Sequence, residues 1–331
     1  MYILAFETSC DDTSVALFED DKLVAMDTAS QIKIHEETGG VVPEVAAREH
    51  ANNIFKVLDN VLVFSGIKLN QVNHIAVTIT PGLVPSLLTG ITVAKTISKT
   101  LQIPLVEINH IEAHIFSNYI DRKDNNIAYP LTCLTVSGGH NEIYLMKDMF
   151  DFKKIGGTQD DSAGEAFDKV AKMMGLGYPG GPIISDLAEK YKTINAGKSK
   201  KLFPRSWLVK EELNFSFSGL KSSVKREIEK RVESKGELTQ QDKQEISFEF
   251  QEAVCEVLST KLVNSADIYN VNTIMLAGGV SANDRLKEYI EELIKGKDIK
   301  FIYPVKKVYS MDNAAMVGIN AYYKIKKKIK G

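Results

Sequence analysis

The strongest constraint on the fold of this 331-residue chain is a pattern that occurs twice. In residues 2–18, an apolar run typical of a buried strand is followed by a polar turn and a second apolar run. Residues 131–145, about 130 positions later, repeat this order of strand, polar turn and strand. Because each opening must bury its apolar face against further elements, the repeat predicts two lobes of similar build.

Helical and strand-like segments alternate between and after these openings. Helical spacing of apolar residues is found at 43–64, 87–94, 162–174, 239–269 and from near Asn313 to the end, and strand-like runs occupy 74–79, 105–108 and 273–277. This alternation predicts an α/β fold with helices covering the sheets. We expect an N-terminal lobe at 1–125 and a C-terminal lobe at 126–331, with a polar, charge-rich insertion near 195–236 and a last helix that can pack back on the first lobe.

Composition and charge narrow the class of protein. Apolar residues make up 44% and charged residues 25% of the chain, as in ordinary globular proteins. With a net charge of −2 the chain has no overall basic field to attract nucleic acid, so an RNA contact needs a local patch. The lysine-rich end at 324–330 is one candidate, although cations at this place also simply complement a helix C-terminus.

Cysteine usage and hydropathy predict a cytoplasmic protein. Cys10, Cys133 and Cys255 are too widely spaced for a CxxC pair or a disulfide framework, which favours a reducing compartment. The N-terminus has no signal-peptide pattern. No apolar run approaches the ~18–20 residues of a membrane-spanning helix, so we expect no membrane segment.

Glycine-rich turns predict a nucleotide-sized ligand. Residues 137–139 and 278–283 each follow a predicted strand, where glycine lets backbone N–H groups approach a phosphate, although such pairs are also common in plain turns. Gly180-Gly181 adds a third site of this kind, and Asp168 is a candidate for binding sugar hydroxyls. Residues 175–180 have the spacing Gly-x-Gly-x-x-Gly, but they follow a predicted helix rather than a strand, which argues against a dinucleotide site. The chain has no Gly-x-x-x-x-Gly-Lys-Ser/Thr motif, which argues against a P-loop site.

Two histidines predict a metal site. His110 and His114 are four residues apart and share one face of a helix, so they can hold one ion. Asp312 is a candidate third ligand, or alternatively the N-cap of the last helix. A zinc protease of the zincin type needs Glu directly after the first His, where this chain has Ile111. Glu112 projects to the other side of the helix, which disfavours a protease.

Motifs along nearly the whole chain carry a resemblance to a known family. They lie at residues 7–13, 43–50, 81–83, 109–114, 136–140, 163–169, 177–182, 215–221, 278–283 and 312–316. With these motifs in this order, the chain resembles the tRNA threonylcarbamoyladenosine transferase family (TsaD, also called Gcp or YgjD). The run Asp-Ser-Ala-Gly-Glu-Ala-Phe-Asp at 161–168 resembles its bacterial branch.

The resemblance implies a two-lobed actin-like ATPase, sugar kinase and Hsp70 (ASKHA) fold with duplicated mixed-sheet lobes. It implies transfer of threonylcarbamoyl from threonylcarbamoyl-AMP to N6 of the adenosine 3′ to the anticodon in tRNAs reading codons that begin with A, with release of AMP. The family's metal, iron or zinc, falls on His110, His114 and Asp312. Its adenylate and substrate contacts fall on Thr135, Val136, Ser137, Gly138, Gly139, Asp168, Gly181 and Asn283. Ser185 stands where many members have an aspartate, and no ribose contact is carried over to it.

The general base is not identified by the residues, and His140, directly after the glycine turn, is a candidate. The partners that the resemblance implies are tRNA, a TsaB-type paralogue, a TsaE-type P-loop ATPase and a TsaC-type synthase that supplies the intermediate. Two other functions on the same fold are alternatives, namely a sugar kinase or ATPase and a non-catalytic scaffold that holds nucleotide.

Overall fold

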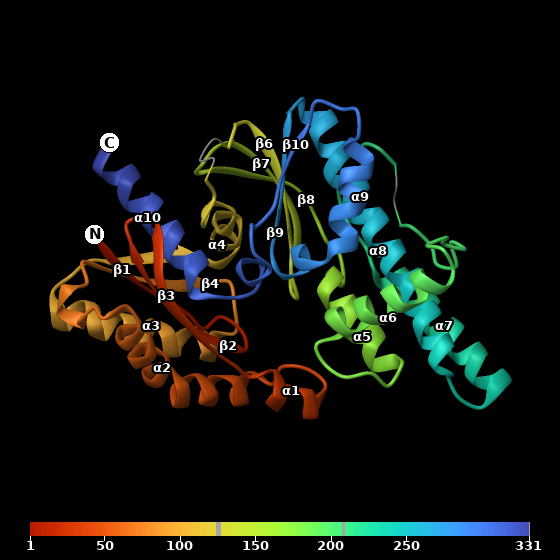
Figure 1. Ribbon diagram of the computed structural model, residues 1–331, viewed down its shortest axis with the longest axis horizontal. Coiled ribbons are helices and arrows are strands. Elements are labelled where there is room, and N and C mark those ends of the chain that lie inside the picture. The colour runs from red at the N-terminus through yellow and green to blue at the C-terminus, as the bar shows by residue number, and fades with distance from the viewer. Residues whose placement is uncertain (124–126, 207–208, 331) are drawn as a thin grey trace. The chain divides into compact units, whose positions relative to one another are not determined.

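A computed structural model describes residues 1–123, 127–206 and 209–330, with the side chain of 330 left aside. Figure 1 shows the elements, which form two compact units, Met1–Asn125 with Pro304–Gly331 and Asn126–Tyr303. The boundary expected between residues 125 and 126 lies outside the described residues. The last helix, α10 (Ala314–Lys330), packs on β1 (Tyr2–Glu7) and its neighbours and so belongs to the first unit.

The first unit is built on a five-stranded mixed sheet. Its other strands are β2 (Asp12–Glu19), β3 (Lys22–Ser30), β4 (His74–Thr80) and β5 (Leu105–Asn109), in the order β3-β2-β1-β4-β5. β1, β2 and β3 form an antiparallel meander, whereas β4 and β5 run parallel to β1. Parallel neighbours need crossover connections, and helices supply them here.

Helices cover both faces of this sheet (Figure 1). They are α1 (Ile32–Thr38), α2 (Pro43–Ser65), α3 (Val84–Leu101), α4 (His110–Phe116) and α10. Side chains alternate along β1 as in any strand, so Leu4 and Phe6 join the core under α2 and α3. Ala5 faces α10, where Gly318 allows a close approach because a Cβ there would lie 2.5 Å from the Phe18 ring.

The second unit repeats the same sheet. Its strands are β6 (Leu131–Val136), β7 (Asn141–Asp148), β8 (Asp151–Gly157), β9 (Thr273–Ala277) and β10 (Lys300–Ile302), in the order β10-β9-β6-β7-β8. β6, β7 and β8 are antiparallel and β9 and β10 run parallel to β6, the pattern seen for β1 to β5. The predicted duplication of mixed-sheet lobes is therefore confirmed.

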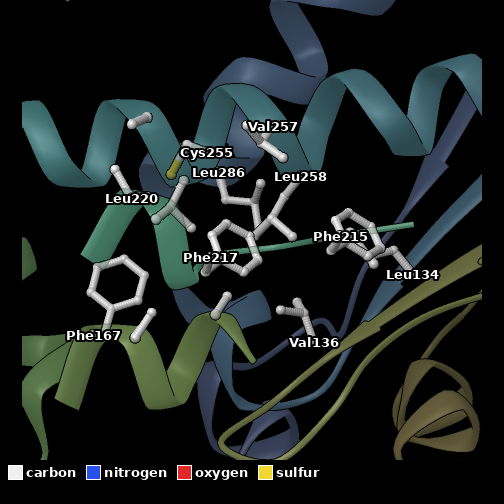
Figure 2. Packing of buried hydrophobic residues seen from close by; sticks show 14 of the residues in the cluster. Leu134, Val136, Phe167, Phe215, Phe217, Leu220, Cys255, Val257, Leu258 and Leu286 are labelled. Atoms are coloured by element: carbon white, nitrogen blue, oxygen red, sulfur yellow. The ribbon is translucent and has the colours of Figure 1, made fainter. Parts of the chain in front are cut away.

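The second core lies between this sheet and a long helix. The helices are α5 (Ala163–Met173), α6 (Gly180–Ile194), α7 (Ser218–Lys235), α8 (Gln240–Tyr269) and α9 (Asp284–Ile294). Figure 2 shows Phe215 and Phe217 between α8 and the β6 side chains Leu134 and Val136. Part of the segment expected as a polar insertion at 195–236 is thus core-forming, because α7 buries Leu220 in the same cluster.

Within the described part of the chain, none of the helices combines the length and the apolar character needed to cross a membrane.

Candidate functional site

The metal-site candidates of the first unit are positioned by a strand that turns directly into a helix. β5 ends at Asn109, whose side chain accepts hydrogen bonds from the backbone N–H groups of Ile111 and Glu112 and so caps α4. His110 is therefore the first residue of α4, and His114 follows one turn later on the same face. Both side chains are buried.

Three side chains converge at this point. His110, His114 and Asp312 each offer one ligand atom, and these atoms lie within 4.8 Å of one another, the one such group found among the described residues. Asp312 Oδ1 is 3.0 Å from His114 Nε2 and 3.7 Å from His110 Nε2. His114 Nε2 nevertheless makes no hydrogen bond, so the ring nitrogen points beside the carboxylate oxygen rather than at it. Side chains that bind one ion have this geometry, with their ligand atoms close together but directed at the ion rather than at one another.

The alternative function of Asp312 as a helix cap is wrong. α10 begins at Ala314, and Asn313 Oδ1 accepts the hydrogen bond from Met316 N that an N-cap receives. Asp312 is half-exposed at 26%, whereas the two histidines are buried. The carboxylate is therefore the solvent-facing member of the group.

A buried carboxylate stands behind His110. Glu7 Oε2 lies 3.4 Å from His110 Nδ1, and Ser9 Oγ lies 3.1 Å from the same nitrogen. Glu7 is itself held by hydrogen bonds from Ser9 N (2.6 Å) and Thr78 Oγ1 (2.5 Å). With Nδ1 engaged, the Nε2 atom of His110 is left on the side of Asp312.

The charges of His110, Glu7 and Asp312 strongly influence one another. Burial by itself lowers the pKa of His110, but Asp312 and Glu7 outweigh it and raise the pKa to about 9. Burial likewise works to raise the pKa of Glu7, and the attraction of His110 lowers it below its usual range. A positive charge is therefore favoured among these carboxylates.

The glycine turns of the second unit meet at one edge of its sheet. β6 and β9 are parallel neighbours, with Thr135 paired to Ala277, so the turns that follow them lie side by side. Gly278 has φ +88°, and a Cβ on it would lie 2.5 Å from Val136 O. Ser162, the N-cap of α5, donates to Gly138 O at 2.5 Å. The edge has the strand ends and helix starts that bind ligands in α/β sheets.

The predicted nucleotide contacts divide into open and committed positions. A Cβ at Gly138, Gly139 or Gly181 would meet no atom within 4 Å, so space for a ligand adjoins them. The side chains of Thr135 and Val136 are buried, and the Thr135 hydroxyl donates to Glu142 O at 3.3 Å, so neither side chain is open to a ligand. The remaining positions have polar groups with partners inside the protein. Asp168 Oδ1 accepts a hydrogen bond from Gly180 N at 2.7 Å, and Ser137 N donates to His140 O at 2.8 Å. Asn283 caps α9, and Ser185 Oγ donates to Gln251 Oε1.

Glu112 is not among the converging side chains. Its Oε2 pairs with Lys324 Nζ of α10 at 2.8 Å. Glu112 therefore lies away from the two histidines, as helix geometry predicts, and cannot act as the general base of a zinc protease there.

Sequence reasoning missed Glu7 and Gln251. An acidic residue at the end of the buried strand-like run 2–7 is a signal that could have identified Glu7, because a buried carboxylate needs partners. Gln251 lies within the long helix α8 and carries no motif signal. Only the structure brings it to Ser185 and Asn283.

A family model described as TsaD, tRNA N6-adenosine threonylcarbamoyltransferase, matches residues 22–319 of the chain. The chain is similar to a protein of Persephonella marina named tRNA N6-adenosine threonylcarbamoyltransferase, at 44% identity over 330 residues, 98% of this chain and 91% of the relative. A protein of the same name from Clostridioides difficile is 44% identical over 321 residues, 97% of this chain and 92% of the relative.

Two solved structures share the fold at low identity. Component A of the (R)-2-hydroxyglutaryl-CoA dehydratase of Acidaminococcus fermentans superposes with a TM-score of 0.53 at 15% identity, covering 98% of each chain. Full-length HypF gives a TM-score of 0.61 at 12% identity, covering 100% of this chain and 47% of HypF. These likenesses concern the fold alone. With the duplicated sheets, they confirm the predicted two-lobed ASKHA fold.

Proposed function

The chain belongs to the tRNA N6-adenosine threonylcarbamoyltransferase family, and we propose from this membership how its own residues carry out the transfer. The protein is a tRNA-modifying acyltransferase, which moves a threonylcarbamoyl group to N6 of an adenosine in tRNA. We infer that threonylcarbamoyl-AMP is the donor and that the acceptor is the adenosine 3′ to the anticodon in tRNAs reading codons that begin with A. The convergence of His110, His114 and Asp312 is the observation that carries the catalytic part of the proposal.

His110, His114 and Asp312 would hold a resident divalent ion. Two imidazoles and a carboxylate suit iron or zinc better than magnesium or calcium, which prefer oxygen ligands. The fit is supported by His114, whose two ring nitrogens are buried and make no hydrogen bond within the described part of the chain. When bound, such an ion supplies Lewis-acid polarisation of a carbonyl oxygen. Glu7 and Ser9 orient His110 so that Nε2 is presented to it.

The second unit would bind the adenylate and stabilise the leaving group. In the transfer, N6 attacks the carbamoyl carbon, the bond to the phosphate oxygen breaks with its electron pair, AMP departs and N6 loses a proton. Backbone N–H groups of Gly138 and Gly139 would donate to the phosphate, where negative charge develops, whereas the Ser137 N–H is held by His140 O. Because an adenine amine is a weak nucleophile, much of the acceleration must come from placement. His140 is the candidate to accept the proton.

Family membership supports a proposal for the partners and for the location. tRNA is the substrate of the family. A TsaB-type paralogue, a TsaE-type ATPase and a TsaC-type synthase are proposed partners, and the exposed apolar side chains Phe55, Val63 and Phe64 of α2 support a protein contact on that helix. The three cysteines are unpaired, which supports the proposed cytoplasmic location.

The test is an Asp312→Asn variant assayed with synthetic threonylcarbamoyl-AMP, tRNA and the partner proteins, with metal content measured by mass spectrometry. We expect loss of bound metal and a fall in transfer of about 100-fold or more, because several kcal/mol of charge stabilisation are removed. Asp59→Asn, an exposed position of α2 in the same unit, is the matched control and should keep both. Full transfer activity by an Asp312→Asn or His110→Ala protein without metal would refute the proposed role of the ion.

A further inference from the structure

Three polar side chains of the second unit form one hydrogen-bonded cluster. Ser185 of α6 donates from Oγ to Gln251 Oε1 of α8 at 2.8 Å. Asn283, which precedes α9, donates from Nδ2 to Gln251 Oε1 at 2.9 Å and to Ser185 Oγ at 3.1 Å. We call these residues the Ser185–Gln251–Asn283 cluster. None of them carries a charge.

A helix cap fixes the orientation of the cluster. Asn283 Oδ1 accepts from Leu286 N at 3.2 Å as the N-cap of α9, so its Nδ2 must face the other way, toward Gln251. An N–H group needs an acceptor, which means that Gln251 presents Oε1 to Asn283 and directs Nε2 elsewhere. The amide orientation of Gln251 therefore follows from secondary structure rather than from local choice.

A count of donors leaves Gln251 as the group that can bind a ligand. Both N–H groups of Asn283 are used, and the single hydroxyl hydrogen of Ser185 is donated to Gln251. Within residues 1–123, 127–206 and 209–330, nothing accepts a hydrogen bond from Gln251 Nε2. Gln251 is only 5% exposed, yet Nε2 is not among the fully buried atoms that lack a partner. It therefore reaches accessible space.

Open space adjoins the elements that carry the cluster. Gly181 lies one turn before Ser185 on α6, and Gly279 precedes Asn283 in the turn after β9. A Cβ on either glycine would meet no atom within 4 Å. The buried Gln251 amide thus belongs to the same ligand-accepting edge as the glycine turns.

We propose that Gln251 determines specificity for the donor nucleotide by donating a hydrogen bond from Nε2 to a ribose hydroxyl. This inference rests on the proposed adenylate donor. A hydroxyl can accept this bond and still donate elsewhere, which suits a cluster of uncharged amide and hydroxyl groups. Because Oε1 is held by two hydrogen bonds, the amide is ordered before the ligand arrives, and little side-chain entropy is lost on binding.

The experiment measures binding of AMP, 2′-deoxy-AMP and 3′-deoxy-AMP to the full chain by isothermal titration calorimetry. We expect the protein to bind one deoxy analogue about tenfold more weakly than AMP, the effect of one hydrogen bond. Gln251→Met should bind AMP and that analogue equally, because the donor is gone. Gln241→Met, an exposed position of the same helix, is the matched control and should discriminate like the unchanged protein.

Each outcome decides between readings. If Gln251 has a purely structural role, Gln251→Met will bind all three nucleotides more weakly by the same factor. Discrimination between AMP and the deoxy analogue that is preserved in Gln251→Met would overturn the inference. Should Gln251→Met fail to fold, Gln251→Glu decides whether Nε2 binds a ribose hydroxyl or a purine nitrogen. Its carboxylate keeps the acceptor for Ser185 and Asn283 and can accept a hydrogen bond from a sugar hydroxyl, so discrimination persists. If a purine nitrogen is the true partner, it loses its donor and AMP binding falls sharply. Equal binding of AMP and both analogues by the unchanged protein would refute the ribose contact while leaving the proposed donor intact. Absence of any AMP binding would refute the donor itself.

Discussion

A buried lysine in the second unit allows one prediction to be worked out in detail. Lys261 of α8 is fully buried, donates from Nζ to Glu212 O at 2.6 Å, and lies 5.7 Å from the centre of the Phe215 ring. Burial lowers the pKa of Lys261 to about 8 from an ordinary 10.5. The folded protein therefore binds this proton less tightly than the unfolded chain does.

The sign of the effect follows from this difference. Below pH 8 both states are protonated, and the folded state carries the full penalty of burying a charge. Between about pH 8 and 10.5 the folded state loses the proton first, so the penalty disappears as the pH rises. A shift of about 2.5 units corresponds to roughly 3 kcal/mol in the free energy of unfolding.

Lys261→Met isolates this contribution. The variant also leaves Glu212 O without this donor, which costs about 1–3 kcal/mol at every pH and so shifts the curve without changing its slope. We expect the difference in unfolding free energy, unchanged protein minus variant, to increase by up to roughly 3 kcal/mol from pH 7.5 to pH 10.5. Titration of other groups is common to both proteins and cancels.

The assay is urea unfolding followed by circular dichroism at pH 7.5, 8.5, 9.5 and 10.5. Lys190→Met, an exposed lysine on α6, serves as the control and should give a difference that does not change with pH. A flat difference for Lys261→Met as well would refute the reasoning, because it would mean that the lysine titrates alike in both states.

Two further predictions concern the candidate sites. Glu7→Gln should weaken zinc binding by about 10–100-fold, because the carboxylate that orients His110 is replaced by an amide. Zinc titration in a chelator buffer at pH 9, where only about half of His110 is protonated and proton competition changes the affinity about twofold, checks this against Glu107→Gln on the exposed side of β5. Equal affinities would contradict it. Gly180→Ala should destabilise the protein by about 1–3 kcal/mol through overpacking, because its Cβ would lie 2.5 Å from Phe167 O. The midpoint of thermal unfolding should fall accordingly. Gly181→Ala, where a Cβ meets nothing within 4 Å, should keep the midpoint and weaken AMP binding, and the opposite ranking of the pair would show that the open space at Gly181 is not a ligand site.

The strands that carry the fold could be predicted because their apolar runs are buried on both faces. The apolar runs at residues 2–6 and 131–136 predicted strands, and both segments are strands in the structure. β10 was missed, since a three-residue strand gives no periodicity, and β3 was missed because its outer residues are half-exposed. The segment 195–236 was expected as an insertion because its charges hide the spacing of Leu220, Val224 and Ile228, which α7 buries.

The candidate metal site was readable from local spacing for only two of its members. The i, i+4 histidine pair is a property of any helix, so His110 and His114 were identified before the structure. Asp312 was ambiguous, because a carboxylate before a helix is equally suited to a cap, and the hydrogen bond from Met316 N to Asn313 settled the cap. Glu7 reaches His110 across 103 positions of sequence, which no local pattern reports.

The sequence by itself determined the α/β class, the duplication and the family, because these depend on periodicity and on motifs that are local in the chain. It also determined which residue types were available for an ion and for a nucleotide. Only the tertiary structure decided which of them meet: Glu7 behind His110, Asp312 before His114, and Gln251 between Ser185 and Asn283. The physical reason is that a hydrogen bond or a ligand contact requires about 3 Å of separation, and distances of that kind between remote residues are set by how sheets and helices pack.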